Sequence, residues 1–140
     1  GPGTQNQANA LAIGPSGRYI TIGQFCDDQC NPRGELRLFL PGGMLQWHKV
    51  LAPAVTSTRD IGWHPADYIV YAGARDEGQG TESFFVEAWI PPHGVPLWSY
   101  AQVPGSGASV ARALAFGPYG QIYAGGTTSD GHPALAVIAP

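Results

Sequence analysis

One short segment recurs three times along the chain, and it limits the possible folds more than any other feature. The copies read LAIGPSGRYITIG at 11–23, IGWHPADYIVYAG at 61–73 and LAFGPYGQIYAGG at 114–126. In each copy large and small residues alternate ahead of a proline, and the last residue is a glycine. Alternation with period two predicts a β-strand, because successive side chains of a strand point to opposite sides. The small positions predict that one face of this strand is crowded.

A second segment recurs with the same period. It reads LRLFLPGGMLQW at 36–47, VEAWIPPHGVPLW at 86–98 and LAVIAP at 135–140. The first two copies continue through a glycine turn into a further strand, which carries Trp47 and Trp98. Each repeat therefore predicts four short antiparallel strands over about fifty residues, which is a period typical of β-propeller blades.

The composition agrees with short strands joined by turns. The 140 residues include 20 glycines and 13 prolines, yet 44% of the residues are hydrophobic, so a packed core is expected. Seven Lys and Arg residues against ten Asp and Glu residues give a net charge of −3, which argues against binding nucleic acid. No apolar run is long enough for a transmembrane helix, and no membrane span is expected.

We expect an all-β, propeller-like chain with three repeats, at 10–59, 60–112 and 113–140. The third repeat lacks its fourth strand, so the chain would hold about 2.75 four-stranded antiparallel blades. Residues 1–9 are expected to be a tag remnant or an N-terminal extension. The alternative is a β-trefoil, which also has three four-stranded repeats. Strands that are apolar on both faces favour the propeller, in which one sheet lies between two others.

The repeats resemble those of a known family. The segments ALAFGPYGQIYAGG (113–126), LRLFLPGGMLQWHKV (36–50) and AWIPPHGVPLWSY (88–100) are similar to repeats of bacterial β-propeller proteins found outside the cell. The resemblance covers nearly all of the three repeats. The second repeat departs from the family by having Ala66 and Asp67 where a turn glycine is preferred. The resemblance implies a propeller fold and an extracellular or cell-surface location.

The expected function is that of a non-catalytic binding or structural scaffold. A closed propeller typically has at least four blades, and an open arc would expose apolar sheet faces, which monomeric proteins rarely do. We therefore expect completion by a second copy, giving six blades, or by the remainder of a longer chain. One alternative is a lectin-like module that binds a carbohydrate, and a protein ligand is also considered.

A second alternative is an enzyme with its site at the central channel. The strands expected to face the channel offer only Asp60 beside Asn9, Arg59 and Arg112. The sequence contains no motif for a nucleophile, a phosphate-binding loop or a metal site. We therefore expect no catalytic residue, no cofactor and no bound metal.

Cys26 and Cys30 are the only cysteines, and they stand in the loop sequence CDDQC. Two cysteines so close together predict a disulfide that staples this loop, which fits an oxidising compartment. A metal site would need two more soft ligands, and the redox signature is CxxC rather than CxxxC.

Acidic residues recur in the loop after the second strand of every repeat. They are Asp27, Asp28, Asp76, Glu77 and Asp130. Equivalent loops of a propeller share one rim, so one hypothesis is a rim that binds calcium or a polar ligand. The simpler interpretation is that turns favour aspartate.

Trp47 and Trp98 occupy the same repeat position. Exposed tryptophans can stack on sugar rings, but aromatic residues that recur in a repeat more often pack between neighbouring sheets. We expect packing for both side chains.

Overall fold

The computed structural model describes residues 7–76, 78, 81–91, 93–102, 109–128 and 130–139. This part of the chain consists of strands and turns, with a single 3-10 turn at Pro15–Gly17. The strands are β1 (Gln7–Ile13), β2 (Tyr19–Cys26), β3 (Pro32–Phe39), β4 (Leu45–Val50), β5 (Val55–His64), β6 (Tyr68–Asp76), β7 (Glu82–Trp89), β8 (Pro96–Gln102), β9 (Ser109–Phe116), β10 (Ile122–Thr128) and β11 (Pro133–Ile138). None of the described segments is a helix that could cross a membrane.

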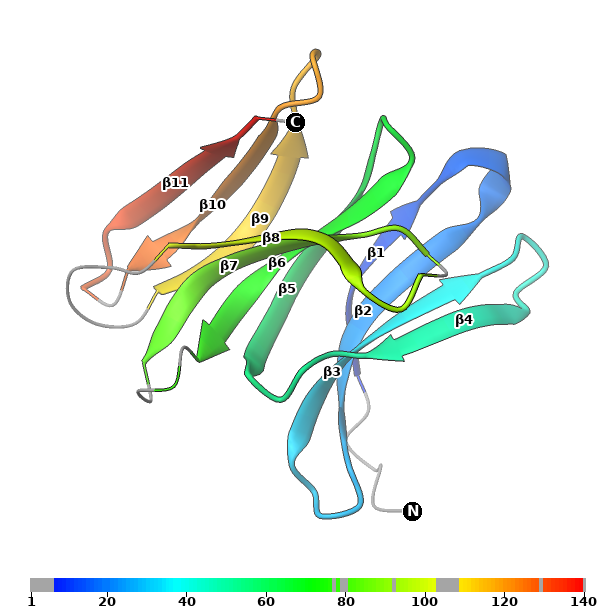
Figure 1. Ribbon diagram of the computed structural model, residues 1–140, viewed down its shortest axis with the longest axis horizontal. Coiled ribbons are helices and arrows are strands. Elements are labelled where there is room, and N and C mark those ends of the chain that lie inside the picture. Colours follow the sequence, from blue (N-terminus) through cyan, green and yellow to red (C-terminus); the bar gives the residue numbers. More distant parts are fainter. Residues whose placement is uncertain are drawn as a thin grey trace.

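The strands form three antiparallel sheets, and within each sheet neighbours along the chain are hydrogen-bonded. Sheet 1 has the order β1-β2-β3-β4, sheet 2 the order β5-β6-β7-β8, and sheet 3 the order β9-β10-β11. The sheets lie side by side in chain order (Figure 1). The prediction of an all-β fold with antiparallel strands is confirmed. In the described part no sheet closes on itself or shares a strand with another, whereas the repeats of a β-trefoil combine into one barrel.

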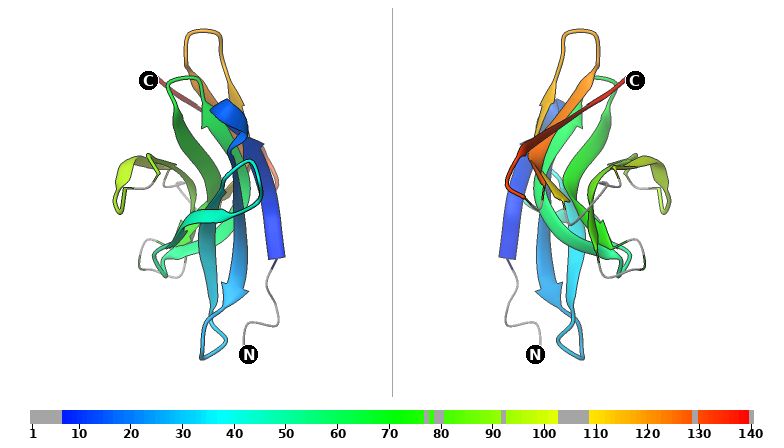
Figure 2. Two further views of the ribbon diagram at one scale, coloured as in Figure 1. Left: turned by 90° about the vertical axis from the view of Figure 1, so that its right-hand side faces the viewer. Right: turned by 90° about the vertical axis from the view of Figure 1, so that its left-hand side faces the viewer.

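The three sheets contact one another mainly through their first strands. β5 packs against both β1 and β9. β8, the strand at the opposite edge of sheet 2, lies away from these first strands. Figure 2 shows β1 (blue) and β8 (yellow-green) on opposite sides of the molecule in both views. Each sheet therefore has an inner edge, where the sheets meet, and an outer edge, which points away.

Each first strand contains a bulge opposite a glycine. The pairing register shifts by one residue at Asn9 in β1, at Arg59 in β5 and at Arg112 in β9. The glycines of the second strands at these points are Gly23, Gly73 and Gly126, and a Cβ atom on any of them would overlap a backbone carbonyl oxygen of the first strand. The glycine that ends each copy of the first repeated segment is therefore required by the close approach of two backbones.

The first strands begin at Gln7, Val55 and Ser109, which is before the predicted repeat boundaries at 10, 60 and 113. The pairing continues past each bulge, so β1 extends into the segment that the sequence assigned to an N-terminal extension. Each predicted boundary falls on the residue directly after a bulge. The reason is that an extra residue shifts the alternation of large and small side chains by one position.

The core has two parts, one on each face of sheet 2. The first lies between sheets 1 and 2 and contains Ile20, Leu38 and Tyr71, and the second lies between sheets 2 and 3 and contains Val70 and Ile122. Sheet 2 is thus covered on both faces, which explains why its strands are apolar on both sides.

Polar contacts fix the sheets relative to one another at the inner edge. The Asn9 side chain of β1 donates from Nδ2 to the carbonyl oxygen of Thr58 in β5 at 2.8 Å. The carboxylate of Asp60 in β5 accepts a hydrogen bond from the backbone N–H of Leu114 in β9 at 2.9 Å. These contacts set the register between neighbouring first strands.

Candidate functional site

The repeat makes it possible to compare the same position in all three sheets. In sheet 1, Ile20 lies opposite Leu38, and the two side chains are 0% and 1% exposed. In sheet 2 the corresponding pair is Val70 and Ala88, and both are 0% exposed. Cross-strand partners point to the same side of a sheet. In both cases this side is covered by the following sheet.

The same position in sheet 3 is exposed. Tyr123 lies opposite Val137, and the two are 38% and 57% exposed. Leu135, opposite Gly125 on the same face, is 65% exposed. We call this surface the C-face. Its residues are Ala113, Ala115, Tyr123, Gly125, Leu135 and Val137.

The opposite face of sheet 1 is exposed in the same way. Leu11 and Ile13 of β1 are 56% and 73% exposed, whereas Ile61, the counterpart of Leu11 in sheet 2, is buried. Tyr19 and Phe39 stack on this face with ring centroids 5.0 Å apart. We call this surface the N-face. Its residues are Leu11, Ile13, Tyr19, Thr21, Gly23, Glu35, Arg37 and Phe39.

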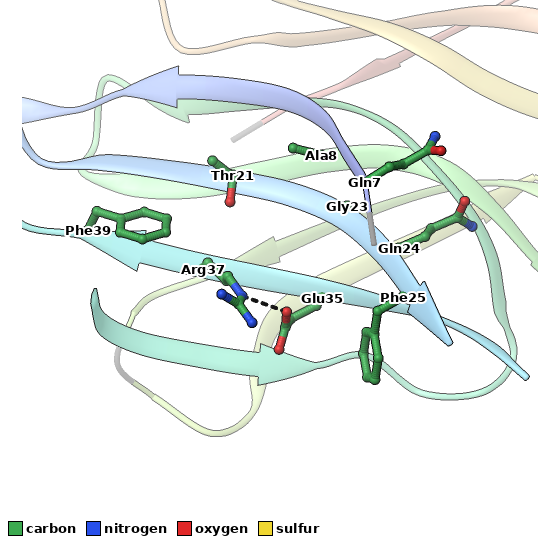
Figure 3. Close-up of a pocket in the computed structure, with 9 residues that line it drawn as sticks. All are labelled: Gln7, Ala8, Thr21, Gly23, Gln24, Phe25, Glu35, Arg37 and Phe39. Atoms are coloured by element: carbon green, nitrogen blue, oxygen red, sulfur yellow. Dashed lines mark hydrogen bonds and ion pairs between the residues drawn. The ribbon is translucent and has the colours of Figure 1, made fainter. Parts of the chain in front are cut away.

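The N-face contains a groove of about 480 Å³. Figure 3 shows Phe39 and Phe25 at its two ends, with the ion pair between Arg37 and Glu35 between them. The small residues Thr21 and Gly23 of β2 line the groove beside this ion pair. The groove therefore combines two aromatic rings and small residues with one ion pair and the side-chain amides of Gln7 and Gln24.

Glu35 is the centre of a small polar cluster on this face. Arg37 donates from Nε to Glu35 Oε1 at 2.7 Å, and His48 Nδ1 lies 3.3 Å from Glu35 Oε2. The Glu35 side chain is largely buried. Because Arg37 and Glu35 neutralise each other, a partner can cover this face without burying an unpaired charge, which would be strongly destabilising.

A buried polar network holds sheet 2 together and was not predicted from the sequence. Glu87 of β7 accepts hydrogen bonds at Oε1 from the hydroxyl of Tyr71 at 2.8 Å and from Nε1 of Trp89 at 2.9 Å. Burial, followed by the nearby carboxylate of Glu87, raises the pKa of Tyr71 well above its ordinary value. Tyr71 meets Glu87 and Trp89 only when β6 pairs with β7, so no motif marks the network in the sequence.

The inner edge carries two polar hollows, of about 320 and 250 Å³, and Arg59 lines both. The arginines at the bulges of β5 and β9 are hydrogen-bonded to nearby hydroxyl groups. Arg59 donates from Nε to the Ser57 hydroxyl at 2.9 Å, and Arg112 donates from Nε to the Thr127 hydroxyl at 3.2 Å. Both carboxylate oxygens of Asp60 accept backbone N–H groups. Asp60 therefore acts as a link between strands rather than as an acid or base free to react.

The predicted disulfide is not formed in the structure. Cys26 and Cys30 are free thiols, and Cys30 donates a hydrogen bond to Cys26 with the sulfur atoms 2.6 Å apart. A disulfide requires about 2.05 Å. Cys26 is buried, whereas Cys30 is exposed on the turn. The hydrogen bond with Cys30, followed by burial, raises the pKa of the Cys26 thiol.

The described acidic residues of the first two repeats lie at the ends of strands or in turns: Asp27 and Asp28 follow β2, and Asp76 is the last residue of β6. Asp27 accepts hydrogen bonds from the backbone N–H groups of Gln29 and Asn31, both at 2.9 Å. The hydrogen bond from Asn31 lowers the pKa of Asp27. Asp28 is exposed, and Asp76 accepts a hydrogen bond from the backbone N–H of Gly78 at 2.8 Å. Glu77 lies outside the described residues.

Asp130 repeats this arrangement in sheet 3. Its carboxylate accepts a hydrogen bond from the Thr128 hydroxyl, which lowers the pKa of Asp130, and it lies 3.7 Å from His132 Nε2. Across the described ranges, no three His, Cys, Asp or Glu side chains come together as a group that could hold a metal ion. The carboxylates of Asp27, Asp76 and Asp130 accept hydrogen bonds from residues close to them in the sequence. The hypothesis of a shared ligand-binding rim stays a prediction.

Trp47 and Trp98 pack between strands rather than standing free. The ring of Trp47 lies 6.4 Å from that of Trp89 beside the first core cluster, and the ring of Trp98 lies edge-on to Tyr68 at 6.5 Å beside the second. Both side chains are half-buried. Their shared repeat position thus corresponds to a shared packing position at the outer edge of sheets 1 and 2.

The fold and its uncovered surfaces define the class of protein: an all-β repeat protein of three antiparallel sheets, with exposed apolar side chains on the two outermost faces. No protein-family model matches this sequence, and a search of curated proteins gives no match.

Proposed function

We propose that the chain is a non-catalytic structural and binding scaffold of the β-propeller type, whose N-face and C-face are covered by further sheets of the same kind. One observation carries the proposal. The side chains that are 0% or 1% exposed between the sheets have counterparts on the C-face that are 38% and 57% exposed. Apolar surface of this kind is stabilised when a partner removes it from water.

The inner edge supports the propeller arrangement. The first strands β1, β5 and β9 lie next to one another, as the innermost strands of adjacent blades do. The same bulge recurs in all three, so further sheets of this repeat can continue the arc without a change of backbone geometry. Either a second copy or the remainder of a longer chain would continue it.

The experiment compares the chain with a double variant, Ile13→Asp with Val137→Asp, which places a charge on each face. We expect the chain to self-associate or to bind a dye that fluoresces on apolar surfaces. The double variant should keep its circular dichroism spectrum, lose the dye signal and have the mass of one chain. A wild-type chain that is monomeric and binds no dye contradicts the proposal.

The lectin-like alternative depends on tryptophans that are free to stack on a sugar. Both repeat-equivalent tryptophans are engaged in packing, so no observation favours this alternative over the scaffold. The extracellular location implied by the family resemblance stays a prediction.

A further inference from the structure

We infer that the sheet covering each face is supplied by a second copy of this chain, and that the C-face of one copy docks on the N-face of the other. This inference rests on the proposed function and adds the identity of the partner and the direction of docking.

The direction follows from the two contacts between sheets within the chain. In the first, the side of sheet 1 that carries Ile20 packs against the side of sheet 2 that carries Tyr71. In the second, the side of sheet 2 that carries Val70 packs against the side of sheet 3 that carries Ala124. Tyr123 of the C-face is the repeat counterpart of Ile20 and Val70, so the C-face corresponds to the side of a sheet that packs against the following sheet. The N-face corresponds to the other side, which packs against the preceding sheet. One chain therefore carries both halves of a third contact of the same type.

The sizes of the side chains on the two faces are complementary. Ile20 and Val70 are aliphatic, but the C-face has the larger Tyr123 at this position, where it stands 38% exposed. The N-face has Thr21 where sheet 2 has Tyr71, and Thr21 lines the groove of about 480 Å³. A large side chain on the C-face thus meets a small residue and a groove on the N-face, which is the packing that an apolar interface needs.

One polar contact of the inner edge can also recur between two copies. Within the chain, Asn9 donates to the carbonyl oxygen of Thr58 in the next sheet. Arg112 occupies the position of Asn9 in sheet 3, and Ala8 occupies the position of Thr58 in sheet 1. The guanidinium group of Arg112 can therefore donate to the carbonyl oxygen of Ala8 in the second copy.

Docking in this direction has a consequence for symmetry. Each copy uses its C-face once and its N-face once, so two copies form two identical contacts related by a two-fold axis. The result is a closed ring of six sheets in which both apolar faces of each copy are buried. Pairing of two C-faces, by contrast, has no counterpart among the contacts within the chain.

The experiment uses three single variants at exposed positions. Val137→Asp charges the C-face, Ile13→Asp charges the N-face, and Val95→Asp is the matched control, since Val95 is 69% exposed in the turn before β8 and belongs to neither face. Masses are measured by light scattering on a sizing column, and circular dichroism checks that each variant is folded.

We expect the wild type and Val95→Asp to have the mass of two chains, and each face variant alone to have the mass of one chain. Each face variant should associate at least about a hundredfold more weakly, because a buried unpaired charge is strongly unfavourable. An equimolar mixture of the two face variants should regain dimers. One intact C-face then meets one intact N-face, and the two charged faces stay apart in water, so the mixed dimer is held by a single contact and the ring is open at the other.

Several results would overturn the inference. If Val137→Asp or Ile13→Asp alone remains a dimer, the contact pairs two identical faces or uses another surface. If the mixture stays monomeric although each variant is folded, the two faces are not each other's partners. A wild type that is monomeric but binds the dye overturns the second copy as partner while leaving the proposed scaffold intact.

Discussion

The indole ring of Trp63 in β5 lies directly on the backbone of Gly14 in the turn after β1, with no room for a side chain between them. Arg18, in the same turn, covers this ring, with its guanidinium carbon 5.1 Å from the ring centroid. Asp67 accepts a hydrogen bond from the indole Nε1 at 2.9 Å. Trp63 is thus held in place by the turn that follows β1, and it connects the first two sheets.

Gly14→Ala should therefore lower the free energy of unfolding by about 1–3 kcal/mol, because the added methyl group forces the indole ring away. The backbone at Gly14 is extended, so the substitution introduces no strain of its own. Gly42→Ala is the control, since a Cβ there meets nothing within 4 Å. Denaturant unfolding followed by tryptophan fluorescence measures both variants. Equal stabilities would show that the Trp63 contact is not tight.

Glu87→Ala should lower the free energy of unfolding by about 2–4 kcal/mol, because it leaves the Tyr71 hydroxyl and the Trp89 indole N–H buried without an acceptor. Glu87→Gln retains a carbonyl oxygen at this position and should cost clearly less. Thermal unfolding of the two variants in parallel measures the difference. If both substitutions have the same effect, the two hydrogen bonds do not account for the stability that Glu87 provides.

The buried Tyr71 predicts a loss of stability in alkaline solution. Its folded pKa lies well above the ordinary value of 10.0. Between these two pKa values the folded state retains a proton that the unfolded state has lost, so stability falls as the pH rises above 10.0. Tyr71→Phe should show a weaker decline over the same range. Urea unfolding at a series of pH values measures the slopes, and identical slopes would argue against the assignment.

The two thiols should form an intramolecular disulfide when the chain is treated with oxidised glutathione. The Cys30 thiolate attacks the glutathione disulfide and releases one glutathione thiolate, and Cys26 then displaces the second, so the chain loses two hydrogen atoms and glutathione is reduced. Closing so short a loop should add up to about 2 kcal/mol to the stability.

Mass spectrometry detects the loss of the two hydrogens, and Cys30→Ser is the control, which can carry only a mixed disulfide. Wild-type chain that keeps two free thiols under these conditions would show that the CDDQC turn cannot reach disulfide geometry.

The three sheets could be predicted from the sequence because each repeat carries its own local pattern. Alternating side chains, a proline turn and a final glycine recur together, and all three reflect interactions within one hairpin. The first strands begin before the expected repeat boundaries because the bulges at Asn9, Arg59 and Arg112 interrupt the alternation from which those boundaries were drawn.

The groove on the N-face and the network around Glu87 could not be predicted. Both depend on which side chains neighbouring strands bring opposite one another, and a shift of one residue would change every partner. The spacing of Cys26 and Cys30 likewise indicates that the thiols are close but does not determine whether they are bonded.

The recurrence of the bulge with its glycine bears on how such a chain can change its length. Every sheet meets the next through the same inner-edge geometry, so a duplicated repeat would find a matching surface at either end of the stack. Loss of a repeat would leave the remaining contacts unchanged for the same reason. Gain and loss of whole repeats is therefore a route of divergence open to this protein, whereas insertion of single residues into a first strand would disturb the bulge on which every contact depends.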